Sequence, residues 1–453
     1  MKFQKRLLVV AMAAALPCMG AGAQSVADLK KEIELMRAQF AAQIKALQEK
    51  IDATESKATA GNVDPEEFNR IRTKVEASED STIASGFKGL KVSGMVDPTY
   101  IYNRRARSSG FVFLNNFDGQ GRSGEFADGF DGYSYDNSYF GQAMLDIQKE
   151  TEDGVKWRLT LAPHKAANSA TNIGSIVHEG SVSVPLNSSQ TRLLAGQFPD
   201  WSGYEYSWAH LNPLVTHNLL FDFTIPSYYT GAGIENTSGK WLSKVLVGSI
   251  DGVRGRGARK PGVMYRVDYS KGEFSGFGFA GAHSRNSVDS DLFEVDGYYI
   301  RGDWTLQGQA GVGRIRNAAG DGSGADAKWW GLSGLAGYKI TPRLQALARV
   351  DYIDNHKNGG GVYGSYGWDP ADDPSGSGFA VDGRNGFGST GNPARGVNRT
   401  ALSTGLNYVY SESTTLKLEL RFDHASGDVF FDPRNGTFSK NNTLLGGAVV
   451  VKF

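Results

Sequence analysis

Cysteine is almost missing from the sequence, since Cys18 is the single one in 453 residues. It lies in a segment with a basic start, an apolar run over residues 7–16 and Ala-Gly-Ala at 21–23. This pattern predicts a secretory signal peptide over residues 1–23, whose removal takes the cysteine with it. The mature chain would then have no disulfide, thiolate metal ligand or cysteine nucleophile. The alternative is a lipoprotein lipidated at Cys18, although Pro17 before it is untypical of such a site.

Long apolar runs and an excess of one charge are also missing. No later run reaches the roughly 18 residues that a membrane-spanning helix needs. The 48 Lys and Arg residues balance the 48 Asp and Glu residues, so charge gives no reason to expect nucleic acid as a partner. The seven histidines lack metal-binding spacing, and the Asp- and Gly-rich loops 116–136 and 367–384 do not match the EF-hand pattern. We therefore predict no metal, no cofactor and no enzymatic activity.

Strict alternation of apolar and polar residues is abundant instead. In Thr415–His424, leucines and a phenylalanine share one strand face while Lys, Glu, Arg and Asp share the other. Similar segments recur from residue 89 to the C-terminus, with little helical periodicity that could cover their apolar faces. The chain also has 58 Gly, 24 Phe, 19 Tyr and 8 Trp, which suit twisted strands and interfacial aromatic belts. The composition and pattern predict an all-β fold, a closed transmembrane β-barrel.

The alternating segments predict an antiparallel barrel of sixteen strands. We expect the strands near residues 91–102, 138–149, 155–164, 175–186, 191–198, 230–237, 241–250, 262–270, 274–283, 293–303, 306–316, 329–339, 344–354, 399–410, 414–424 and 443–453.

The connections between these strands alternate in length. Segments such as 103–137, 199–229 and 355–398 are long, whereas 151–154 and 187–190 are short. Outer-membrane barrels have short periplasmic turns and long outer loops. We therefore expect the N-terminal segment and the C-terminus to lie in the periplasm.

A helical segment is expected between the signal peptide and the barrel. Apolar residues from Val26 to Phe40 are spaced by three and four residues, as in a coiled coil, and the pattern continues to Ile51. We predict a self-associating periplasmic segment over residues 24–80, followed by the barrel domain over residues 81–453. A monomeric helical hairpin is the alternative.

Three stretches resemble known barrels. The C-terminal VVVKF, with Val449, Val451 and Phe453 on one face, is similar to the terminal signal that the barrel-assembly machinery reads. Residues 217–229 and 367–379 resemble a proteobacterial family of uncharacterised porins. With the signal, the coiled coil and sixteen strands, the chain resembles Gram-negative trimeric porins. The resemblance implies a homotrimer in contact with outer-membrane lipid, lipopolysaccharide and the assembly machinery. It also implies that small hydrophilic solutes pass through the pore.

In general porins the third outer loop folds inward and narrows the pore, and the matching stretch here is 199–230. The resemblance implies that its acidic and aromatic side chains form a constriction opposite basic residues of the wall. The loop residues are Asp200, Trp201, Tyr204, Glu205, Trp208 and Asp222. The wall residues expected from the strand pattern are Lys156, Arg158, Arg192, Arg266, Arg349, Lys417 and Arg421.

The predicted function is an outer-membrane channel for passive diffusion of small hydrophilic solutes and ions. Loop 251–261 clusters arginines, which suit anion collection in a phosphate-selective porin, lipopolysaccharide binding, or solvent exposure alone. Acidic residues between the basic ones of the wall argue against phosphate selectivity. The alternative from another class is a structural tether or adhesin whose barrel is plugged.

Overall fold

The fold is taken from a computed structural model, in which the chain divides into two compact units, Met1–Gly86 and Phe87–Phe453. The structure describes residues 73, 88–105, 107–113, 141–162, 176–226, 228–250, 260–270, 274–285, 289–319, 323–358, 395–428, 430–432, 434–435 and 437–453. The predicted signal peptide, the coiled coil, both Asp- and Gly-rich loops and most of loop 251–261 lie outside these residues.

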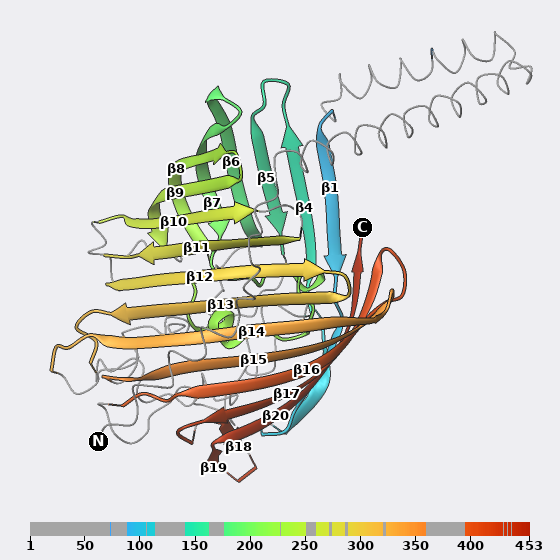
Figure 1. Cartoon of the computed structure of the whole chain (residues 1–453), viewed down its shortest axis with the longest axis vertical. Coiled ribbons are helices and arrows are strands. Elements are labelled where there is room, and N and C mark those ends of the chain that lie inside the picture. The colour runs from blue at the N-terminus through green and yellow to red at the C-terminus, as the bar shows by residue number, and fades with distance from the viewer. Residues whose placement is uncertain are drawn as a thin grey trace, which may run out of the picture. The chain divides into compact units, whose positions relative to one another are not determined.

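Antiparallel strands make up most of the second unit (Figure 1). The strands of the large sheet are β1 (Leu90–Val96), β2 (Thr99–Asn103), β3 (Ser108–Val112), β4 (Ala143–Glu150), β5 (Lys156–Leu161), β6 (Val177–Ser188), β7 (Thr191–Pro199), β8 (Tyr228–Ser238), β9 (Trp241–Ile250), β10 (Gly262–Ser270), β11 (Ser275–His283), β12 (Ser290–Arg301), β13 (Trp304–Ile315), β14 (Ala327–Thr341), β15 (Leu344–Lys357), β16 (Arg399–Val409), β17 (Thr414–Ala425) and β20 (Asn441–Lys452). A separate hairpin is formed by β18 (Phe430–Asp432) and β19 (Thr437–Ser439).

The large sheet closes on itself as a barrel. The last strand, β20, pairs with β17 on one side and with β1 and β2 on the other. Asp97 and Pro98 interrupt the first barrel strand and split it into β1 and β2, and Pro has no N–H to donate to the ladder. The second barrel strand is likewise split, because β3 pairs with β2 and β4 pairs with β1. The eighteen segments therefore form the sixteen antiparallel barrel strands that the alternation predicts.

The two faces of the barrel wall differ as the alternation predicts. On β17, Leu418 and Phe422 of the apolar face are 49% and 47% exposed, whereas Glu419 and Arg421 of the polar face are fully buried. A soluble sheet would bury the apolar face and leave the charged face in water. This barrel has the reverse arrangement, which suits hydrocarbon outside and a polar interior.

Outward-facing aromatic side chains gather towards both ends of the strands. Near the short turns, Trp241 packs on Tyr269 with ring centroids 4.7 Å apart, and Trp304 packs on Tyr338 at 4.9 Å. Near the long loops, Trp330 packs on Tyr352 at 5.3 Å. Aromatic belts of this kind mark the two membrane interfaces of outer-membrane barrels. Among the described residues, no helix has both the length and the apolar character needed to cross a bilayer.

Some elements differ from the sequence-based expectation. The expected long gap 103–137 contains β3, whose Ser-Ser-Gly start gives almost no apolar alternation. The strand expected from residue 138 begins at Ala143. The hairpin of β18 and β19 was not expected either, because each of its strands has only three residues and so shows no period.

Candidate functional site

The connection between β7 and β8, residues 200–227, contains two short helical segments. These are η2 (Ala209–Leu211) and α4 (Leu219–Phe223). Asn218 is the N-cap of α4, because its side-chain oxygen accepts a hydrogen bond from the Phe221 N–H at 2.8 Å. An asparagine at this position satisfies a backbone donor that the first helical turn leaves free.

This loop packs against the inward face of β13–β17 and β20. Leu219 and Leu220 are fully buried, which is unusual for a connecting segment. Gly405 of β16 permits the approach, since an added Cβ would lie 2.5 Å from the Leu214 side chain and 2.7 Å from the Leu418 carbonyl oxygen. The loop therefore occupies part of the barrel interior and leaves the opposite side open.

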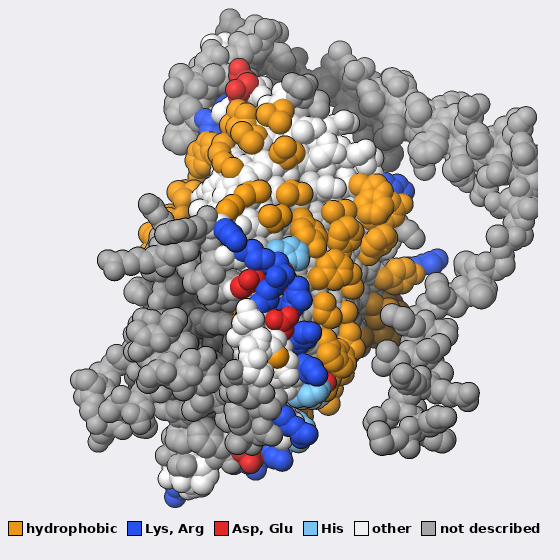
Figure 2. Space-filling view, turned by 90° about the vertical axis from the view of Figure 1, so that its left-hand side faces the viewer, with side chains coloured by type: hydrophobic (Ala, Val, Ile, Leu, Met, Phe, Trp, Pro, Cys, Tyr) orange, Lys and Arg blue, Asp and Glu red, His pale blue; other side chains and the backbone are white. Residues whose placement is uncertain are grey.

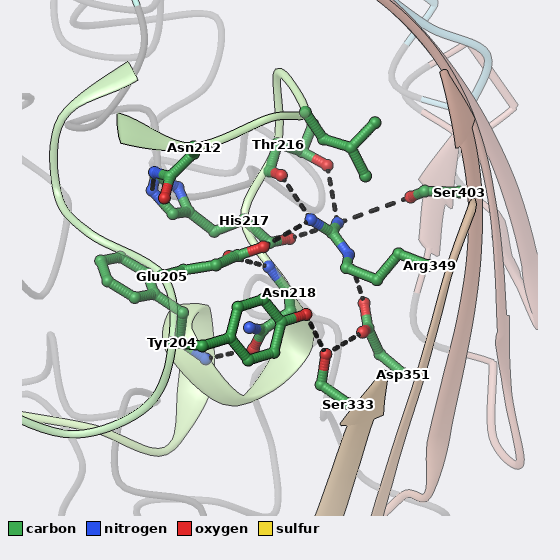
Figure 3. A network of polar contacts seen from close by, with 12 residues as sticks. Tyr204, Glu205, Asn212, Thr216, His217, Asn218, Ser333, Arg349, Asp351 and Ser403 are labelled. Atoms are coloured by element: carbon green, nitrogen blue, oxygen red, sulfur yellow. Dashed lines mark hydrogen bonds and ion pairs between the residues drawn. The ribbon is translucent and has the colours of Figure 1, made fainter. Parts of the chain in front are cut away.

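Arg349 of β15 is the main polar anchor of the loop (Figure 3). Its Nη1 donates to Glu205 Oε1 at 2.9 Å and to the Thr216 carbonyl at 2.7 Å, and its Nη2 donates to the His217 carbonyl at 2.8 Å. Its Nε donates to Asp351 at 3.1 Å. A buried guanidinium is stabilised only when its donors and its charge are matched, and here loop and wall share that task.

Two further wall residues reach the same stretch of loop. Glu419 of β17 accepts from the Val215 N–H at 2.8 Å and from the Thr216 N–H at 2.7 Å. Lys417 donates to the Ala209 and Asn212 carbonyls. The loop backbone thus replaces water as the hydrogen-bond partner of buried wall charges.

Neutral hydrogen bonds complete the attachment. The Tyr204 hydroxyl lies 2.7 Å from the Ser333 hydroxyl, which donates to Asp351 at 2.7 Å (Figure 3). Asn218 Nδ2 donates to Gln309 of β13 at 3.0 Å. The loop is therefore fixed to several strands at once.

The open side of the interior is a cavity of about 1100 Å³. It extends from the short-turn ends of β4, β5, β9 and β10 to the loop, because Lys149, Lys240 and Ser270 line it together with Trp208 and Asp222. Ten of the thirteen residues that the sequence analysis placed in the pore line it: Asp200, Trp201, Tyr204, Glu205, Trp208, Asp222, Lys156, Arg158, Arg192 and Arg266.

Acidic and basic side chains alternate around the cavity wall. Arg158 Nε lies 2.8 Å from Asp146 Oδ1, and its Nη1 lies 3.4 Å from Glu179. Across the cavity, Arg266 forms ion pairs with Asp268 and Asp296. The guanidinium groups are thus held in fixed positions and partly neutralised.

Two loop carboxyl groups have altered acidity. Burial raises the pKa of Asp200 to about 6, although hydrogen bonds from Tyr229 and Ser202 oppose the change. Burial likewise raises the pKa of Glu205 to about 7, and the Arg349 guanidinium opposes it. Asp200 therefore changes charge close to neutral pH.

The predicted wall residues fall into two sets. Lys156, Arg158, Arg192 and Arg266 line the cavity, whereas Arg349, Lys417 and Arg421 contact the loop. The sequence analysis did not identify Glu419, Asp351 and Thr216 as site residues, although the strand pattern places the first two on the inward face. Within the described part of the chain, no cluster of His, Cys, Asp and Glu could hold a metal ion.

Solved porins have a similar fold. An anion-selective porin from Comamonas acidovorans is 11% identical, with 80% of this chain and 99% of that chain covered and a TM-score of 0.51. OmpT of Vibrio cholerae in a trimer form gives the same identity and coverage with a TM-score of 0.49. OmpF of Salmonella typhi, in a complex with daunomycin, is 11% identical over 80% of this chain and 97% of that one, with a TM-score of 0.47.

Likeness at this level of identity concerns the fold alone. No protein with a curated description matches the chain significantly. The model of one family, described as Putative beta-barrel porin-2, OmpL-like, matches residues 89–453. That match begins one residue before β1 and ends at the C-terminus, so it covers the whole barrel. The chain belongs to this family of porin-like outer-membrane β-barrels.

Proposed function

We propose that the barrel is a passive diffusion channel for small hydrophilic solutes and ions, narrowed by the loop 200–227. The observation that carries the proposal is the charged cavity of about 1100 Å³ beside a loop anchored to one side of the wall. A barrel of about sixteen strands leaves an aqueous interior unless something fills it. Here the loop fills one side, and polar side chains line the other.

Selectivity would come from the placement of charges around the cavity. Arg158 and Arg266 each lie beside two carboxylates, so the described side chains form no unbroken row of bases across the interior. This alternation favours a general pore over a phosphate-selective one. Fixed charges of both signs orient water and select solutes by charge and dipole.

The test is the ion conductance of the purified protein in a planar bilayer. Deleting part of the loop between Gly203 and Leu214 removes the segment that contacts Lys417 and Arg349, so we expect a larger single-channel conductance. A deletion of similar length within residues 317–325, between β13 and β14, is the matched control and should leave conductance nearly unchanged. Unchanged conductance of a folded variant with the shortened loop 200–227 would show that this loop is not the constriction.

A second candidate function is a structural barrel whose interior is closed, as in a tether or adhesin. The many contacts between the loop and the wall favour it, because a loop held by Arg349, Glu419 and Lys417 suits a plug as well as a constriction. The two functions differ in one measurement, since a plugged barrel gives no channel steps in the bilayer.

We also propose that the protein is a homotrimer with both ends of the barrel in the periplasm. The alternation of long and short connections supports this orientation. Residues 24–80 would then form a periplasmic coiled coil, and lipopolysaccharide would surround the long-loop end.

A further inference from the structure

A band of charged side chains lies on the outer surface of the barrel, at the long-loop ends of β11–β15. Figure 2 shows it as a stripe of basic side chains, with acidic and histidine side chains among them, beside a broad hydrophobic surface. The outward positions next to it on the same strands are apolar. Phe293, Val312 and Trp330 are 41%, 51% and 42% exposed.

One carboxylate organises the band. Asp291 accepts from His283 Nδ1 at 2.9 Å, from Arg285 at 2.7 Å, from Arg314 at 2.8 Å and from Arg316 at 3.0 Å. A carboxylate cannot use every donor of three guanidinium groups, because each has five N–H donors. Asp289 and Asp326 also pair with these arginines, at 3.1–3.4 Å. Among the described residues, no ion pair or hydrogen bond uses Nη2 of Arg314 or Nη1 of Arg316, so these groups are available to a second anion.

Two lysines add positive charge at the other end of the band. Lys328 of β14 and Lys357 of β15 are directly opposite each other in the ladder, and both are exposed. Among the described residues, neither ammonium group has an ion-pair partner. Like charges in this arrangement destabilise a sheet unless an anion lies between them. The pair is explained if the protein binds such an anion.

A groove joins the two ends of the band. It has a volume of about 590 Å³, and its charged side is lined by His283, Asp291, Arg314, Lys328, Asp354, His356 and Lys357. Its two carboxylates are already paired, Asp291 with three arginines and Asp354 with His356. Phe293, Val312 and Trp330 line it on the apolar side. Its ligand must therefore combine an anionic part with an apolar part that lies along the barrel wall.

We propose that this groove binds a phosphorylated glycolipid of the outer leaflet, through the phosphate-bearing disaccharide of lipid A. The phosphates contact the lysines and Arg314, and the acyl chains lie on the exposed apolar side chains below. The groove is distinct from loop 251–261, for which the sequence analysis left lipopolysaccharide binding as one of three alternatives. The inference rests on the proposed orientation, with the long loops outside, but not on conductance.

The experiment measures binding of bisphosphoryl lipid A to the purified full-length protein in detergent by native mass spectrometry. We expect Lys328→Gln with Lys357→Gln to weaken binding at least about tenfold, because two charge-assisted contacts are lost. Lys339→Gln with Lys440→Gln is the matched control, since it removes equal charge from exposed positions outside the groove. The control should change binding less than about twofold.

Binding of two other lipids shows whether the bound phosphate belongs to lipid A or to another lipid. Monophosphoryl lipid A should bind more weakly than the bisphosphoryl form, and phosphatidylglycerol more weakly still. Equal binding of phosphatidylglycerol would overturn the assignment to lipid A, as would equal losses in the two double variants. A change in oligomeric state without a change in lipid binding would assign the band to a protein contact instead. None of these outcomes depends on whether the barrel conducts.

Discussion

Single charged residues decide how the interior of this barrel is built. Arg349 is fully buried, yet it lies among Glu205, Asp351 and Glu419 and donates to two backbone carbonyls of the loop. A buried charge without such partners would lower the free energy of unfolding by several kcal/mol, because it loses its hydration. The wall and the loop are therefore complementary at the level of individual atoms.

Replacing Arg349 tests this complementarity. Arg349→Met leaves three buried carboxylates without their main cation, and breaking a buried pair costs roughly 3–5 kcal/mol. We expect faster proteolysis of the loop, a lower unfolding temperature and noisier, larger conductance steps. Arg343→Met is the control, because Arg343 is exposed in a short turn. Equal protease resistance in both variants would contradict the anchoring role.

Asp200 predicts a pH dependence of ion selectivity. Its pKa is raised to about 6, so the carboxyl loses its negative charge as pH falls through that value. The preference for cations over anions, measured from reversal potentials, should therefore decrease between pH 7.5 and pH 5. Asp200→Asn should lack the part of this step near pH 6 and should resemble the wild type at pH 5. An unaltered pH profile in the variant would mean that ions do not sense this carboxyl group.

At the scale of elements, the last strand completes the barrel. The backbone of Phe453 pairs with Gly94, with N–O distances of 3.0 and 3.1 Å, so the terminal residue continues the contact between β20 and β1. Phe453 as a whole residue is nonetheless 75% exposed, and Val449 on the same face is 41% exposed. The Phe453 side chain therefore contributes little buried area to the folded barrel.

Because the Phe453 side chain is exposed, its replacement should affect assembly of the barrel but not the stability of the assembled barrel. Phe453→Ser should reduce the amount of heat-modifiable barrel in the outer membrane several-fold, because we propose that the assembly machinery reads the terminal aromatic residue with Val449 and Val451. The unfolding temperature of the barrel that does assemble should change little. Lys452→Ser, on the other face of β20, is the control. Normal assembly of Phe453→Ser would contradict the proposed signal.

At the scale of the whole molecule, closure leaves no unpaired edge in the described part of the large sheet, since β20 pairs on both sides. Closure is what allows strands to cross a bilayer, because every ladder hydrogen bond is made within the protein. Oligomerisation is then not needed to protect an edge, and the proposed trimer would depend on wall contacts or on residues 24–80.

A fragment of residues 24–80 distinguishes these two sources. The Val26–Phe40 spacing gives a narrow apolar stripe that requires a partner helix, so the fragment should sediment as an oligomer, with a trimer as the expected state. Replacing Leu29 and Ile33 with Asp should return it to a monomer. If the unmodified fragment remains monomeric at high concentration, the proposed trimer must depend on the barrel wall.

The strand pattern by itself determined the architecture, because alternation is local and its polarity shows which face needs water. It placed the short turns correctly and put Arg349, Lys417 and Arg421 on the inward face. It could not show β3 or the hairpin of β18 and β19, which are too short or too weakly alternating. Nor could it show where β1 and β2 separate.

Only the tertiary structure decided which inward charges line the cavity and which hold the loop. Arg349 and Glu205 are 144 residues apart, and their contact depends on barrel closure and on the path of residues 200–227. The same applies to the outer groove, where Lys328 and Lys357 meet only through the register of β14 with β15. The two-residue period of the sequence assigns each side chain to a face of the sheet. Contacts between distant strands depend on register and closure, and the period gives no information about either.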